Sequence, residues 1–261
     1  MDRPTVDNTI IVSAAAYEKP HEAVAVTSKA FRYAGLPVRY LRWGSTWVDY
    51  YHAKIIPIID NIDQWISEGV RHLIWIDATD SIPLASWTEI VNRYAEKIAP
   101  ANRMTFAADY HRPYHCNEPW LKKMLDSTDQ CGAEKGYPCA GLFAGPLEII
   151  KQVTDLTTDI SHDRNRLHKK YPYYQLLTNK KFIETRNDQF LFHLGFIENP
   201  SLFKIDYEKQ LFSNYLGGNR PDEARKPHPD AWYSIGDALI VHGPTLKQGR
   251  VNFTWFDQYT R

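Results

Sequence analysis

The chain has 261 residues, of which 43% are hydrophobic and 24% charged, a composition typical of globular proteins that excludes a disordered or fibrous chain. Its 31 basic and 31 acidic residues cancel, and this zero formal charge argues against a general coat for nucleic acid. No apolar run is long enough to cross a bilayer or to act as a secretory leader, and three cysteines cannot all pair within the chain. We therefore expect a soluble, intracellular, cytoplasmic protein, and a viral or bacterial source would fit this expectation.

Residues 8–107 alternate between strand and helix patterns. Apolar runs rich in β-branched residues predict buried strands, and apolar residues at helical spacing between them predict helices. Pro57 marks a bend or a late start in the second helix. In chain order, the expected elements are a strand at 8–16, a helix at 20–34, a strand at 37–41, a helix at 51–68, a strand at 71–77, a helix at 87–99 and a strand at 103–107. This alternation is typical of a parallel α/β sheet with helices on both faces, in which ligands bind at the carboxyl ends of the strands.

The second half of the chain has a weaker pattern with long loops. Gly141 and Gly145 lie in an apolar run, CAGLFAG, where the missing side chains would let a ligand approach the backbone or let a strand pack tightly. The remaining expected elements are a helix at 147–153, a helix at 187–196 and a strand at 237–243. Because no repeat or linker divides the sequence, we expect one α/β domain with long loops over residues 1–261.

Two acidic residues follow the third expected strand, in the sequence IWIDATD. Asp77 and Asp80 lie just beyond the carboxyl end of this strand, where two carboxylates can converge on one cation. A hard cation such as Mn²⁺ or Mg²⁺ in this position would also bind phosphate oxygens. The alternative is that Asp77 only caps the next helix or turn, which is a common role for aspartate.

A histidine and a lysine lie at and beyond the end of the last expected strand. His242 offers an imidazole, a common ligand of Mn-type ions, although a single histidine after an apolar strand is often structural. Lys247 follows a few residues later and could neutralise a diphosphate leaving group. At the start of an expected helix, Asp188 either caps that helix or, beside Asn187, binds donor hydroxyls or orients an acceptor hydroxyl.

Two further features have more than one interpretation. Histidines and cysteines in the central loops could form a zinc site, but the absence of a CxxC pair favours chance proximity; they are His111, His115, Cys116, Cys131 and Cys139. Residues 161–186 hold seven basic residues against two acidic ones, interleaved with tyrosines. This segment is either a solvated helix and loop or a surface where cations contact phosphates and tyrosines stack on bases.

Taken in order, these motifs resemble the glycosyltransferase domain of the lysyl hydroxylases and, more distantly, the collagen galactosyltransferases. The resemblance runs from VSAAAYEKP to VHGPTLK and covers most of the chain. It implies a GT-A fold, which has a Rossmann-like, mostly parallel central sheet with helices on both faces, together with a UDP-sugar donor and Mn²⁺. The residues carried over are Asp77, Asp80 and His242 as metal ligands, Asp188 and Asn187 at the family's DDQ motif facing sugar and acceptor, Lys247 as a diphosphate contact, and Trp47, Lys54, Thr79 and Gly243 as nucleotide contacts.

The resemblance further implies a metal-dependent, retaining glycosyltransferase that moves a hexose from a UDP-sugar to a hydroxyl group. Residues 1–110 would form the nucleotide-sugar-binding half and residues 111–261 the acceptor-side half. The acceptor is either a hydroxylysine-type protein side chain or a hydroxylated nucleic-acid base, as in modified viral DNA, and would dock near residues 161–186. The alternatives are a non-catalytic nucleotide-sugar binding module and a metal-dependent phosphoester or nucleotide-sugar hydrolase that uses the same carboxylates.

Overall fold

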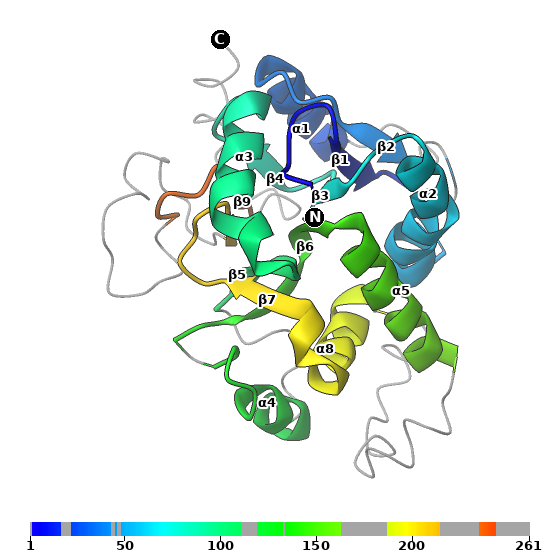
Figure 1. Ribbon diagram of the computed structural model, residues 1–261, viewed down its shortest axis with the longest axis vertical. Helices are drawn as coiled ribbons and strands as arrows, with labels where there is room; N and C mark the ends of the chain where they lie inside the picture. The colour runs from blue at the N-terminus through cyan, green and yellow to red at the C-terminus, as the bar shows by residue number, and fades with distance from the viewer. Residues whose placement is uncertain are drawn as a thin grey trace.

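Six strands pair into one central sheet, and helices pack on both of its faces (Figure 1). The computed structural model describes residues 2–16, 22–42, 45, 48–110, 119–132, 134–162, 187–214 and 235–243. The strand order is β2-β1-β3-β6-β5-β7. The bounds are β1 Thr9–Ala14, β2 Arg39–Leu41, β3 His72–Ile76, β5 Met104–Asp109, β6 Tyr137–Pro146 and β7 Phe203–Asp206.

The central sheet is parallel except for β6. Strand β1 pairs in parallel with β2 and β3, and β5 pairs in parallel with β7, whereas β6 runs antiparallel to both β3 and β5. This confirms the predicted mostly parallel sheet. Because β6 runs the other way, its central residues, rather than its carboxyl end, lie beside the end of β3, where Leu142 pairs with Ile76. The reversed strand therefore contributes backbone to the edge at which the acidic motif begins.

Alternate residues of each strand enter different cores. In β3, Leu73 and Trp75 pack with the helices α2, α4, α5 and α8, whereas Ile74 and Ile76 pack with α1 and α3 on the opposite face. Figure 1 shows α2 and α5 on a different side of the sheet from α3. The helices span α1 Glu22–Tyr33, α2 Ile56–Ser67, α3 Trp87–Arg93, α4 Pro119–Asp126, α5 Leu147–His162 and α8 Asp188–Glu198. Within the described ranges, none of them combines the length and apolar character that crossing a membrane requires.

Several helices depart from regular α geometry where the sequence predicts a boundary. The expected helix at 51–68 opens with a π-helical turn, η1 (Tyr51–Ile55), and Pro57 lies at the start of the α-helix that follows, as its missing N–H favours. The helix α3 continues as a π-turn and a 3₁₀ turn, η2 (Tyr94–Ile98) and η3 (Ala99–Ala101). A short 3₁₀ turn, η5 (Pro200–Leu202), precedes β7.

A second, three-stranded sheet joins segments that are distant in the sequence. It contains β4 (Ser81–Pro83), β9 (Ile240–His242) and β8 (Phe212–Asn214), in the order β4-β9-β8. The expected strand at 237–243 is thus confirmed as β9, although it pairs outside the central sheet. His242 lies opposite Ser81 on one side and Asn214 on the other. This sheet fixes His242 next to the loop that carries Asp80.

A buried histidine at the start of β3 uses both of its ring nitrogens. The His72 Nε2 atom lies 2.9 Å from the Asp2 carbonyl oxygen, and Nδ1 lies 3.1 Å from the Tyr94 hydroxyl. Because a carbonyl oxygen only accepts, Nε2 carries the proton and Nδ1 accepts from Tyr94. Burial lowers the pKa of His72 below its ordinary value. The folded state therefore holds this ring neutral.

We expect the contribution of His72 to the free energy of unfolding to decrease as the pH falls through about 6.5, the ordinary pKa of histidine. In this range the unfolded chain binds a proton at His72 more readily than the folded chain does, so at this residue acid favours the unfolded state. Urea unfolding at a pH of about 7.5 and about 5.5 should show a smaller loss for His72→Gln than for the native protein. Equal losses in the two proteins would contradict this assignment.

Candidate functional site

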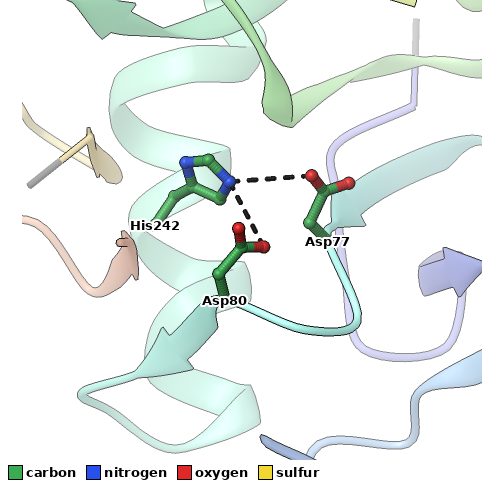
Figure 2. A group of neighbouring side chains, drawn as sticks. All are labelled: Asp77, Asp80 and His242. Carbon is green, nitrogen blue, oxygen red and sulfur yellow. Dashed lines mark ion pairs between the residues drawn. The ribbon is translucent and has the colours of Figure 1, made fainter. Parts of the chain in front are cut away.

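Two carboxylates and one imidazole converge at the carboxyl end of β3. The His242 Nε2 atom lies 3.4 Å from Asp80 Oδ1 and 3.6 Å from Asp77 Oδ2, as Figure 2 shows. Ligand atoms of the three residues all lie within 4.8 Å of one another. Asp80 and His242 are buried, and the side chain of Asp77 is 22% exposed. The three residues predicted as metal ligands thus form one cluster that solvent can reach beside Asp77.

The backbone around the two acids is held by its own hydrogen bonds. The Asp77 N–H donates to the Gly141 carbonyl of β6 at 3.0 Å, and the Gly243 N–H donates to the Asp80 carbonyl at 2.7 Å. The Thr79 hydroxyl donates to Asp80 Oδ1 at 3.2 Å. The turn between β3 and β4 is therefore fixed on both sides. Residues 78–80 form a turn directly after Asp77, so a turn-capping role for Asp77 stays open, whereas the next helix, α3, is capped by Ser86.

The His242 ring is oriented by a residue that sequence reasoning did not identify. Its Nδ1 atom lies 2.9 Å from Asn214 Oδ1, an amide oxygen that can only accept, so the proton resides on Nδ1. This leaves the lone pair of Nε2 directed at the carboxylates, and Nε2 is buried without a hydrogen-bond partner among the described residues. The Cys139 sulfur lies 3.8 Å from Nδ1. Asn214 thus prepares His242 to bind a cation through Nε2.

Charge at the site opposes the effect of burial on His242. Burial alone would lower the pKa of this histidine, but the nearby carboxylates of Asp80 and Asp77 raise it well above its ordinary value. A positive charge at Nε2 is therefore favourable. In chemical terms, the position between the three side chains can be filled by a proton or by a metal cation.

The absence of a side chain at Gly141 makes room for the imidazole. A Cβ atom built at this glycine would lie 2.4 Å from His242 Nε2, closer than non-bonded atoms can approach. The sequence predicted that this glycine either lets a ligand approach the backbone or lets the strand pack tightly. The structure shows tight packing against the His242 side chain from β9, and approach of a ligand stays a prediction.

A buried lysine connects this cluster to the start of α8. The Lys54 Nζ atom lies 3.1 Å from Asp77 Oδ1 and 2.6 Å from Asp188 Oδ2, and it donates to the Ala140 carbonyl at 2.8 Å. Burial opposes the charge of Lys54, but the carboxylates of Asp188 and Asp77 outweigh it and raise the pKa of the ammonium above its ordinary value. Lys54 is therefore charged. Its predicted contact with a nucleotide stays a prediction.

The two residues at the start of α8 have different roles in the structure. The Asn187 side chain accepts a hydrogen bond from the Phe190 N–H at 3.0 Å and caps the helix. The suggestion that Asp188 is the cap is therefore wrong, because its carboxylate, buried and paired with Lys54, faces the site. Participation of Asn187 and Asp188 in catalysis stays a prediction.

The other predicted site residues lie partly within and partly outside the described residues. Thr79 and Gly243 hold Asp80, as given above, and their nucleotide contacts stay predictions. Trp47, Lys247, His111, His115 and Cys116 and most of the 161–186 segment lie outside the described residues. The remaining candidates for zinc, Cys131 and Cys139, are buried in different core clusters. Burial raises the pKa of the Cys131 thiol to about 12.

Replacing Gly141 with alanine should destabilise the fold through a clash with one ring. We expect Gly141→Ala to lower the free energy of unfolding by about 1–3 kcal/mol, the usual cost of overpacking, because the added methyl group displaces His242. In a His242→Ala background the same substitution should cost less than about 0.5 kcal/mol. Urea unfolding of the native protein, both single variants and the double variant measures this coupling. Additive effects would refute the contact.

Comparisons with known proteins give limited information. No family model matches the chain, and no curated protein matches it. Among solved structures, the chain is similar to a glycosyltransferase involved in the glycosylation of the major capsid of PBCV-1, with a TM-score of 0.46 and 14% sequence identity. The match covers 97% of this chain and 98% of that chain.

Proposed function

We propose that this chain is a metal-dependent glycosyltransferase that transfers a hexose from a UDP-sugar to a hydroxyl group. The observation that carries the proposal is the buried His242 Nε2 atom, which lacks a hydrogen-bond partner among the described residues and faces the carboxylates of Asp77 and Asp80. The UDP-sugar and the retaining outcome come from the sequence resemblance described above. The position of the cluster, at the carboxyl end of a strand in a mostly parallel sheet, is where ligands of such sheets bind.

The donor set fits a divalent cation such as Mn²⁺ or Mg²⁺. An octahedral ion of this kind holds adjacent ligand atoms about 3 Å apart, because its bonds are about 2.1 Å long. The distances of 3.4 and 3.6 Å from His242 Nε2 to the two carboxylates need only a small contraction to reach that value. Carboxylate ligands suit both of these ions. Asp77, Asp80 and His242 would leave the remaining positions of the ion to other ligands.

The chemistry follows from where charge develops during sugar transfer. When bound, the cation would stabilise the negative charge on the diphosphate as the glycosidic bond breaks. Lys247 is the residue expected to assist by contacting the same diphosphate. Asp188, held in place by Lys54, would face the donor sugar or the acceptor hydroxyl. Trp47 is expected beside the uridine.

The proposal predicts that Asp80→Asn abolishes transfer and leaves the fold intact. Asparagine has the same shape as aspartate but lacks its charge, so we expect sugar transfer to fall at least about 100-fold with a similar melting temperature. A thermal-shift screen of UDP-sugars with and without Mn²⁺ should first show stabilisation of the native protein, since a ligand that binds the folded state raises its stability. The variant should lose the part of this shift that depends on Mn²⁺.

A matched control is Asp63→Asn, an exposed aspartate on α2 that pairs with Lys151 away from the site. This variant should retain both transfer and the thermal shift. Full activity of Asp80→Asn would refute the site, and the absence of any response to UDP-sugars, with or without Mn²⁺, would refute the donor class. Release of free sugar or phosphate without an acceptor would instead identify a hydrolase. Binding without any turnover would identify a binding module.

Two classes of acceptor fit the sequence, and one measurement distinguishes them. Residues 161–186 carry a net positive charge in the sequence, which suits a nucleic acid. For a nucleic-acid acceptor, DNA binding should weaken steeply as salt rises from about 50 to about 200 mM. If the protein does not bind DNA at the lower salt concentration, a protein hydroxyl of the hydroxylysine type is the remaining acceptor.

A further inference from the structure

Lys54 lies between the proposed metal site and the start of α8. Its Nζ atom is 3.1 Å from Asp77 Oδ1 and 2.6 Å from Asp188 Oδ2. Lys54 comes from η1, Asp77 follows β3 and Asp188 begins α8, so one ammonium group joins three elements. Lys54 and Asp188 are both buried. This arrangement is more than a surface ion pair, because each charge depends on the other to remain in the interior.

Three oxygen atoms lie close to the ammonium group. The Ala140 carbonyl of β6 accepts a hydrogen bond from it, and Asp77 Oδ1 and Asp188 Oδ2 form ion pairs with it. The ring of Trp75 lies on a further side, with its centroid 5.6 Å from Nζ. Two of these neighbours are the carboxylates of Asp77 and Asp188, so the geometry supports a role of Lys54 toward these two side chains.

Lys54 also determines which oxygen of Asp77 faces the metal site. Oδ1 of Asp77 contacts Lys54 and accepts from the Trp75 indole N–H at 3.3 Å. Oδ2 lies toward His242, 3.6 Å from Nε2. Groups that hold a ligating carboxylate through its other oxygen fix its direction and commonly change metal affinity by about 10–100-fold when removed.

We infer that Lys54 is a positioning residue that orients Asp77 toward the metal ion and holds the Asp188 side chain in the same site. The inference rests on the proposed metal site and is independent of which sugar is transferred. In this role Lys54 acts by holding Asp77 and Asp188, and it does not need to contact the nucleotide. It also means that the metal site and the predicted catalytic carboxylate are connected by one side chain.

The test compares Mn²⁺ binding by Asp188→Asn with binding by the double variant Lys54→Met/Asp188→Asn, using calorimetry without nucleotide. The double variant removes both partners of the buried pair, so it leaves no unpaired charge at Asp188 and should fold. Removing Lys54 would change the affinity for Mn²⁺ in opposite directions through its charge and through its positioning of Asp77. Loss of the Lys54 charge near Asp77 would by itself tighten cation binding, whereas loss of the anchor would weaken it.

We expect the double variant to bind Mn²⁺ about tenfold more weakly than Asp188→Asn. Thermal unfolding without metal checks that both variants are folded. Equal or tighter binding by the double variant would overturn the positioning role while leaving the metal site in place. Failure of the native protein to bind Mn²⁺ would overturn the metal site and this inference together. If the double variant binds Mn²⁺ tenfold more weakly but the native protein does not respond to UDP-sugars, the positioning role of Lys54 is supported and only the UDP-sugar donor is refuted.

Discussion

Buried negative charge is the constraint on which the site depends. Three carboxylates, those of Asp77, Asp80 and Asp188, meet at the carboxyl end of β3, and two of them are buried. Moving a charge out of water is costly unless a partner of opposite sign accompanies it. Lys54 supplies one positive charge to this group. A divalent cation would add two more, whereas a proton on His242 would add only one.

The fold meets this constraint by bringing backbone, rather than more side chains, to the crowded edge. Strand β6 runs against its neighbours, so the stretch at Ala140 and Gly141 lies beside the acids. The Ala140 carbonyl accepts from Lys54, and the Gly141 carbonyl accepts from the Asp77 N–H. Gly141 also leaves the space that the His242 ring occupies. A larger residue at this point would leave the carboxylates without their imidazole partner.

The sequence predicted the parts of this structure that follow from local pattern. Buried strands and amphipathic helices are visible as periodicity, and acids after a strand of a parallel sheet must lie at its carboxyl edge, so Asp77 and Asp80 were predictable. The helix α5 extends well past the predicted 153, because the threonines beyond that residue weaken the helical pattern. They are accommodated in the helix by hydrogen bonds to the preceding turn, such as that from Thr157 to the Thr154 carbonyl.

The parts that sequence reasoning missed depend on pairing between distant segments. Strands β4 and β8 have three residues each, too short to show a period, and β8 carries Asn214 to His242. Asp188 and Lys54 are separated by much of the chain. Nothing in the sequence around either residue indicates that the two side chains meet. Reversal of β6 has no signature in its apolar residues. The position of Gly141 in the run was the one local sign of a close approach.

The small sheet β4-β9-β8 has a consequence for how the site is assembled. The two acids belong to a turn between β3 and β4, whereas the imidazole arrives on a strand near residue 242, more than half the chain later. Contacts between such distant segments form late in folding, because the intervening chain must first be ordered. While the protein is being synthesised, the acids therefore exist for a long period without their third partner. The complete set of proposed cation ligands is thus a property of the finished fold, and a chain interrupted before β9 would lack His242 beside Asp77 and Asp80.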